Sequence, residues 1–75
     1  MSELRRVSGA DTIRALEKLG FISVRQRGSH VVMKKTTPAN NAGCVVPLHK
    51  ELAVGTLMGI IRQAKITKEQ FLEVL

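Results

Sequence analysis

The chain has 75 residues, of which 44% are hydrophobic and 24% charged, and its net charge is +6. This length allows one hydrophobic core, so we expect residues 1–75 to form a single domain, and the composition excludes a disordered tail. No apolar run approaches the ~20 residues of a membrane span, and the first six residues lack the apolar stretch of a signal peptide, so the expected compartment is the cytoplasm.

The first helix is predicted to begin after Ser8. Ser8 and Asp11 have the spacing of a capping box, in which the serine oxygen accepts from the Asp11 amide and an acidic group occupies the first turn. Apolar residues then recur at three-residue intervals, which predicts a buried stripe of Ala10, Ile13, Leu16 and Leu19. Gly20 is expected to end the helix as a left-handed residue.

A β-hairpin is predicted after this helix, where the hydrophobic period changes to two. Residues 28 and 29 are interpreted as a two-residue type II′ turn, which pairs Arg27 with His30. Counting back from the turn pairs Arg25 with Val32, Gln26 with Val31, and Val24 with Met33. This register predicts a core face of Ile22, Val24, Val31 and Met33, and a cationic face of Arg25, Arg27, His30 and Lys34.

The rest of the chain predicts a loop, a third strand and two helices. Residues 36–43 are polar turn formers without periodicity, so we expect a flexible loop, followed by a strand from Cys44 to Leu48. A second amphipathic helix is predicted from near Val54, with a stripe of Leu57, Ile60, Ile61 and Ala64. A second capping box at residues 67–70 opens a short helix, whose Phe71, Leu72 and Leu75 are expected to close the core. Together these elements predict an α+β fold, a three-stranded antiparallel sheet with its helices on one face.

The excess positive charge lies in the middle of the chain. From residue 18 to residue 50 there are six basic residues and no Asp or Glu, whereas the other six basic residues are matched by six acidic ones. Such a zone attracts polyanions, of which nucleic acid is the commonest. A merely solvated cationic face would have the same composition.

His30 is the leading candidate for catalysis, because the predicted register places it beside Arg25, Arg27 and Lys34. A histidine can take a proton from a ribose 2′-hydroxyl or give one to a leaving oxygen, while cations neutralise charge on the phosphate. These residue types meet the needs of RNA cleavage, although a solvated histidine among phosphate-binding cations would look the same. His49 is a weaker candidate, since a loop histidine more often has a local hydrogen-bonding role.

Other chemistries are not supported. The basic zone has no carboxylate to hold a hard cation, so we expect no metal and no cofactor. A zinc site of His30, His49 and Cys44 lacks the close paired spacing of known sites, and Cys44 is expected to be a buried, inert thiol. Phe21 and Phe71, the two aromatic residues, are explained as core, so base stacking is not expected.

The sequence resembles the HicA toxins of bacterial and archaeal toxin-antitoxin pairs in a series of motifs: Ser8-Gly9, Leu16-Glu17-Lys18-Leu19-Gly20-Phe21, Gly28-Ser29-His30, Val46-Pro47-Leu48-His49, Gly55-Thr56-Leu57 and Ile60-Ile61-Arg62-Gln63-Ala64. The resemblance implies a fold similar to double-stranded-RNA-binding domains and a type II toxin that inhibits translation by metal-independent mRNA cleavage. It also implies neutralisation by a HicB-like antitoxin. By position, the catalytic histidine is His30, and we assign RNA binding to Arg25, Arg27, Ser29 and Lys34.

Two other functions remain open. A non-catalytic double-stranded-RNA-binding module would share the topology, but such domains usually carry a Lys-rich cluster where residues 53–56 of this chain are uncharged. A protein-interaction domain would use the cationic face to bind an acidic partner, without any dependence on RNA.

Overall fold

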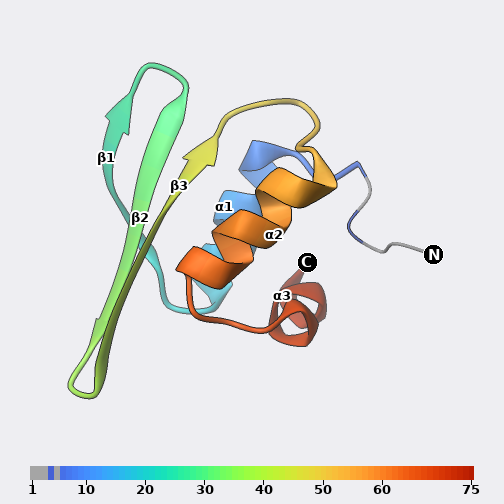
Figure 1. Cartoon of the computed structure of the whole chain (residues 1–75). Helices are drawn as coiled ribbons and strands as arrows, with labels where there is room; N and C mark the ends of the chain where they lie inside the picture. Colours follow the sequence, from blue (N-terminus) through green and yellow to red (C-terminus); the bar gives the residue numbers. More distant parts are fainter. Residues whose placement is uncertain (1–3, 5) are drawn as a thin grey trace.

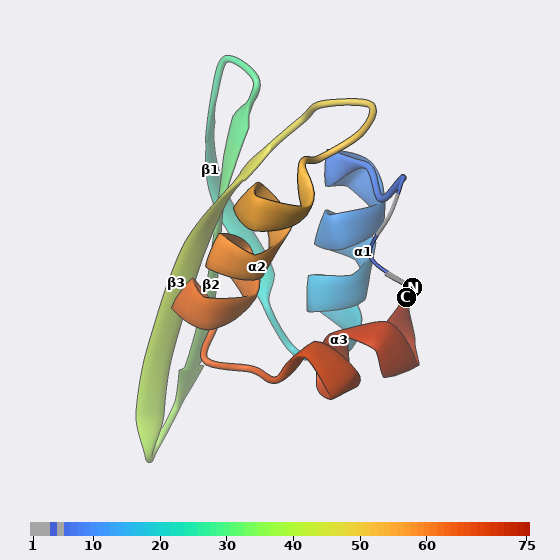
Figure 2. The same cartoon turned by 45° about the vertical axis from the view of Figure 1, so that its right-hand side comes forward.

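The computed structural model describes residue 4 and residues 6–75 (Figure 1). Its elements are, in chain order, α1 (Gly9–Lys18), β1 (Ile22–Arg27), β2 (His30–Thr37), β3 (Asn40–Pro47), α2 (Val54–Gln63) and α3 (Lys68–Val74). The strands form one antiparallel sheet in the order β1-β2-β3. Helices α1 and α2 cover one face of this sheet, which we call the inner face (Figures 1 and 2). The α+β architecture predicted from the sequence is confirmed.

The described part of the chain has no helix that is long and apolar enough to cross a membrane. The expectation that the N-terminus lacks a signal peptide also concerned residues 1–3 and 5, which lie outside the described residues.

Helix α1 begins at the predicted capping box. The Ser8 hydroxyl oxygen accepts from the Asp11 amide at 2.9 Å, and the Asp11 carboxylate accepts from the Ser8 amide at 3.2 Å. Gly20 follows the helix with a φ of +97°, as predicted. The buried stripe is rotated from the predicted one, since Ala10 is exposed and the buried residues are Gly9, Thr12, Ala15 and Leu16. The rotation turns Gly9, which has no side chain, toward the backbone at the end of β3.

The turn between β1 and β2 agrees with the prediction. Gly28 has a φ of +57° while Ser29 is not left-handed, which is the pattern of a type II′ turn. Arg27 therefore pairs with His30. The Gln26 side-chain amide donates to the Gly28 carbonyl oxygen at 3.0 Å and so braces the turn from within β1.

A β-bulge makes the predicted register wrong at the start of β1. The register holds as far as Arg25, but the next paired residue is Ser23, and Val24 is left unpaired between them. The extra residue turns Ile22 to the cationic face, opposite Lys34. Ile22 and Val24 are 63% and 46% exposed, so their predicted places in the core are wrong. All of β1 is exposed, and the buried residues of the sheet belong to β2 and β3.

The predicted flexible loop over residues 36–43 is also wrong. Strand β2 runs to Thr37 and β3 begins at Asn40, so residues 38 and 39 alone form the turn of a second hairpin. Across this turn the Thr37 hydroxyl donates to the Asn40 carbonyl oxygen at 3.1 Å. The hairpin projects beyond the helices (Figure 1), so its strands have little core to bury there and can be polar.

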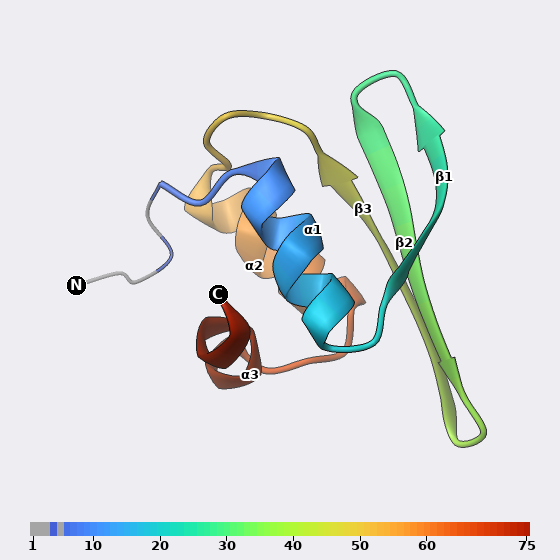
Figure 3. The same ribbon diagram turned by 180° about the vertical axis from the view of Figure 1, so that it is seen from behind.

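Helices α2 and α3 begin where the sequence predicts. In the second capping box, the Thr67 hydroxyl oxygen accepts from the Gln70 amide at 3.0 Å. Helix α3 contacts both α1 and α2 (Figure 3) and buries Phe71. Leu75 lies after the end of α3 and is 46% exposed, so the prediction that it closes the core is wrong. The core between helices and sheet includes Leu16, Val31, Met33, Cys44, Val46, Leu57, Ile60, Ile61 and Phe71.

Candidate active site

The face of the sheet that the helices leave open, which we call the outer face, carries the predicted catalytic histidine. His30 is the first residue of β2 and lies between Arg27 of β1 and Pro47 of β3. Paired residues share a face and successive residues alternate, so Val32 and Lys34 lie on the same face as His30. The imidazole of His30 is exposed and has no hydrogen-bond partner among the described residues. It is therefore accessible to a substrate.

Three cations share the outer face with His30. Arg25 and Arg27 come from β1 and Lys34 from β2, as the predicted register placed them. None of the three side chains has an ion pair or hydrogen bond within residue 4 and residues 6–75. No carboxylate occurs from residue 19 to residue 49, and no ion pair in the described part of the chain neutralises their charge. They are available to phosphate groups.

Other cations of the basic zone hold the fold together. Lys35 lies on the inner face, and its ammonium group donates to the Leu19 carbonyl oxygen at 2.7 Å. A positive charge at this C-terminal end of α1 interacts favourably with the negative end of the helix dipole. The Lys18 ammonium group donates to the Val74 carbonyl oxygen at 3.2 Å. The basic zone of the sequence thus contains two structural cations, the three free cations of the outer face, and Lys50 in the loop between β3 and α2.

Segments that are distant in the sequence meet beside His30. A Cβ atom at Gly9 would overlap the Pro47 carbonyl oxygen and lie 2.9 Å from the Leu48 Cα, so α1 can approach the end of β3 because this residue is glycine. The Leu48 amide donates to the Ser29 carbonyl oxygen at 2.7 Å, which extends the pairing of β2 with β3 past Pro47. Since Pro47 is the strand neighbour of His30, these contacts fix the position of the backbone that carries the His30 side chain.

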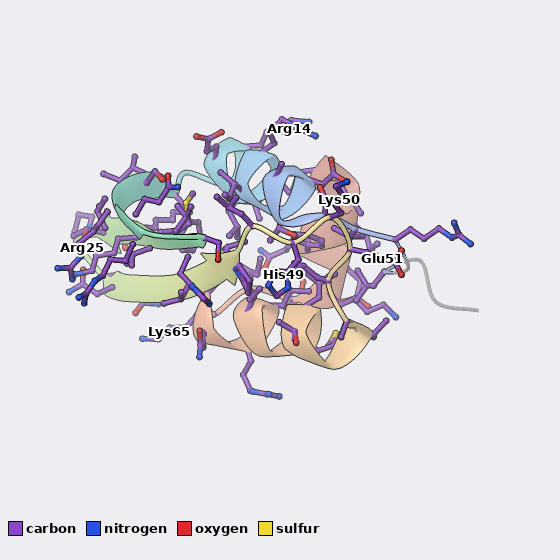
Figure 4. The ribbon with its side chains drawn as sticks, turned by 90° about the horizontal axis from the view of Figure 1, so that it is seen from above. Arg14, Arg25, His49, Lys50, Glu51 and Lys65 are labelled. Atoms are coloured by element: carbon purple, nitrogen blue, oxygen red, sulfur yellow. The ribbon has the colours of Figure 1, made fainter. Side chains whose placement is uncertain are left out.

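His49 occupies a different environment from His30. It lies in the loop between β3 and α2, and its carbonyl oxygen accepts from the Gly9 amide at 2.9 Å. The local hydrogen bond of His49 is therefore made by its backbone and not by its imidazole. In Figure 4 the His49 side chain lies over the helical layer, whereas Arg25 points away from the helices. The structure does not bring His49 into the cationic face.

The zinc site considered from the sequence is not assembled. Cys44 pairs with Met33 on the inner face and is buried, whereas His30 is on the outer face. The expectation that Cys44 is buried is confirmed, and burial raises the pKa of its thiol to about 11. A raised pKa keeps the thiol protonated at neutral pH, which supports the expectation that it is inert. Among the described residues, no group of three His, Cys, Asp or Glu side chains could hold a metal ion.

Polar residues at the far end of the outer face were not predicted from the sequence. Thr36 and Asn41 pair with each other there, next to Lys34 and Gly43, and the group borders a hollow of about 280 Å³. They were missed because residues 36–43 were assigned to a loop. Residues 38 and 39, Pro38-Ala39, lack the glycine or asparagine that marks a two-residue hairpin turn in a sequence, so only the structure pairs Thr36 with Asn41.

The architecture and the open cationic face define a class of protein. A helix, three antiparallel strands and two helices, with the longer helices on one face, form an arrangement like that of double-stranded-RNA-binding domains. Residues 9–66 match the family described as the HicA toxin of bacterial toxin-antitoxin systems. Because this match spans more than half of the chain, the protein belongs to the HicA toxin family, and membership implies a cognate antitoxin partner. A comparison with individually curated proteins finds no match.

Proposed function

We propose that this protein is an endoribonuclease that cleaves mRNA on the outer face of its sheet, with His30 as the catalytic residue. The observation that carries the proposal is the exposed, unpartnered imidazole of His30 on one face with three unneutralised cations. Family membership supports it, since toxins of this family are generally ribonucleases. Cleavage of mRNA would inhibit translation, which places the activity in the cytoplasm.

In the proposed reaction the RNA supplies its own nucleophile. His30 accepts the proton of the ribose 2′-hydroxyl while the 2′-oxygen forms a bond to phosphorus. The bond from phosphorus to the 5′-oxygen breaks, and this leaving oxygen takes a proton from solvent. The products are a 2′,3′-cyclic phosphate and a 5′-hydroxyl. No carboxylate of the sheet is available to hold a divalent cation, so the reaction is proposed to be metal-independent.

The cations of the outer face have two tasks in this proposal. Arg27 lies directly across the strand pair from His30, so it is assigned to the phosphate that is attacked, where it stabilises the developing negative charge. Arg25 and Lys34 lie further along the face and bind neighbouring phosphates. Ser29 adjoins His30 in the tight turn and is assigned to the same RNA backbone.

The test of this proposal is His30→Ala, with His49→Ala as the matched control. The His30 side chain is exposed at the start of a strand, so its removal should leave the fold intact and abolish RNA cleavage. His49→Ala should retain most of the activity, because this residue lies outside the cationic face. Circular dichroism checks folding, and gel analysis of labelled RNA measures cleavage. Full activity of a folded His30→Ala protein would refute the mechanism.

Two further measurements separate this mechanism from others. Cleavage should persist in EDTA, and a loss of activity that magnesium restores would indicate a metal-dependent nuclease. RNA with a 2′-deoxyribose at the scissile position should not be cut. RNA binding without any cleavage by the wild type would favour the alternative, a non-catalytic double-stranded-RNA-binding module. The uncharged N-terminus of α2, residues 53–56, argues against that alternative.

We infer that a HicB-like antitoxin neutralises the toxin by covering the outer face. Covering this face blocks both substrate binding and the catalytic histidine without any refolding of the toxin. In the complex, bound antitoxin should protect the His30 ring from modification by diethylpyrocarbonate. Unchanged reactivity of His30 in the complex would mean that inhibition is indirect.

A further inference from the structure

A hollow lies at the far end of the outer face, away from His30. It measures about 280 Å³ and is lined by Lys34, Thr36, Asn41, Ala42 and Gly43. It is open because Gly43 stands opposite Lys34 in the strand pair and has no side chain to fill the space. Four of its lining residues lie on the outer face, which the helices leave uncovered (Figure 1): Lys34, Thr36, Asn41 and Gly43.

The side chains around the hollow are free to bind a ligand. The Lys34 ammonium group, the Thr36 hydroxyl and the Asn41 amide make no hydrogen bond within the described residues. Strand β3, which carries Asn41, is nevertheless held in place by Lys65, which follows α2. The Lys65 ammonium group donates to the Asn41 carbonyl oxygen at 2.9 Å and to the Asn40 side-chain oxygen at 3.3 Å. The Asn41 amide is therefore carried by a backbone that other contacts already hold in place.

The hollow and His30 lie on the same face of the sheet, at different positions along β2. His30 and Lys34 are on the same face of β2, four residues apart, which corresponds to about 13 Å along a strand. Arg25 and Val32 occupy the row between them. An RNA strand whose scissile phosphate is at His30 would therefore pass over the hollow within a few nucleotides.

We propose that this hollow binds one unpaired purine base of the RNA and so selects where the toxin cuts. The inference rests on the proposed ribonuclease function and adds a base-specific subsite to it. The Asn41 amide presents an N–H donor and a carbonyl acceptor, which complement N7 and the N6 amino group of adenine, and its donor can also meet N7 of guanine. Lys34, at the rim of the hollow, keeps the phosphate contact assigned to it above. The base edge is read by the Asn41 amide without stacking, because Phe21 and Phe71, the only aromatic residues of the chain, are buried.

Two substitutions test the hollow without disturbing the core. Gly43→Val fills the space, and a Cβ atom at this position meets Lys34 Cγ and the Met33 carbonyl oxygen at 3.6 Å, which is ordinary contact. Valine also suits a strand better than glycine does, so the fold should persist. Asn41→Ala removes the amide and leaves the hollow open. Gly55→Ala adds a methyl group in the helical layer, where nothing lies within 4 Å, and serves as the control.

The first measurement is the equilibrium binding of oligoadenylate and oligouridylate by fluorescence anisotropy, with His30→Ala present in every protein so that the RNA stays intact. The wild type and Gly55→Ala should bind oligoadenylate about tenfold more tightly than oligouridylate, as one base-specific contact allows. Gly43→Val and Asn41→Ala should bind the two RNAs almost equally. Equal binding of both RNAs by the wild type, or an undiminished preference in Gly43→Val, overturns the proposal.

The second measurement maps the cut sites in an RNA of randomised sequence. The wild type should prefer a purine at one position within a few nucleotides of the cut, and Gly43→Val should lose that preference while it still cuts. Cutting with unchanged preferences in Gly43→Val refutes the subsite and leaves the ribonuclease function standing. No cutting by the wild type refutes the ribonuclease function, and the binding measurement then decides the subsite independently.

Discussion

Replacing Gly9 by alanine would place a methyl group against the backbone at the end of β3. The new Cβ atom would overlap the Pro47 carbonyl oxygen and lie 2.9 Å from the Leu48 Cα. Both are backbone atoms, so neither can rotate away, and α1 or the end of β3 must move. Overpacking of this kind costs about 1–3 kcal/mol, whereas the better helix propensity of alanine returns at most about 1 kcal/mol.

The expected result is a loss of about 1–2 kcal/mol in the free energy of unfolding. In a domain of this size each kcal/mol lowers the melting temperature by roughly 4–8 °C. Gly55→Ala is the matched control, because this glycine is also in the first turn of a helix and nothing lies within 4 Å of its added Cβ. That control should be more stable than the wild type by about 0.5–1 kcal/mol.

Urea and thermal denaturation, followed by circular dichroism, measure both variants. The two substitutions should change stability in opposite directions, although the chemical change is the same. If Gly9→Ala were as stable as Gly55→Ala, the close approach of α1 to the end of β3 would be wrong. Folded Gly9→Ala should also cut RNA more slowly, because Pro47 is the strand neighbour of His30.

Three further predictions concern charge and ionisation. Arg25→Gln and Arg27→Gln should each weaken RNA binding for all sequences and reduce the log-log salt slope by about 0.7, the value for one phosphate contact on a single strand; unchanged slopes would show that these cations do not bind phosphate. Burial raises the pKa of the Cys44 thiol to about 11 from 9.0, so the stability it contributes is complete below pH 9.0 and is lost as the pH rises toward 11. At pH 8 a thiol reagent should therefore label Cys44 no faster than the chain unfolds, and rapid labelling of the folded protein would contradict its burial. The hydrogen bonds of Asp11 to the backbone and side chain of Ser8 lower the pKa of its carboxyl below 3.8, with a smaller contribution from Arg14. The stability that Asp11 adds is thus complete above pH 3.8 and is lost as the pH falls through its folded pKa. Asp11→Asn should flatten this acid limb in a pH series of urea unfolding, and identical limbs in both proteins would exclude the capping carboxylate as its source.

Features that depend on neighbouring residues could be predicted from the sequence. The helix starts at Ser8 and Thr67 follow from capping boxes that span a single turn of chain. The hairpin turn at Gly28 follows from the left-handed φ that glycine adopts easily, and counting from this turn placed Arg27 and His30 side by side. The cationic face of the candidate site could be predicted for the same reason.

Features that depend on distant segments could not be predicted in this way. The bulge at Val24 is an unpaired residue between two paired ones, and no signal in the local sequence distinguishes it from regular pairing. The strands of the second hairpin are polar because they project beyond the helices, so the hydrophobic alternation that marks a half-buried strand is missing there.

By itself the sequence determined where the helices begin, where the first hairpin turns, and that a histidine shares a face with arginines. Only the tertiary structure showed which cations of the basic zone are held by the fold. Lys34 and Lys35 are adjacent in the chain, yet Lys34 faces the hollow on the outer face while Lys35 donates to the end of α1. The physical reason is that successive residues of a strand point to opposite faces, and their roles depend on which face α1 and α2 cover.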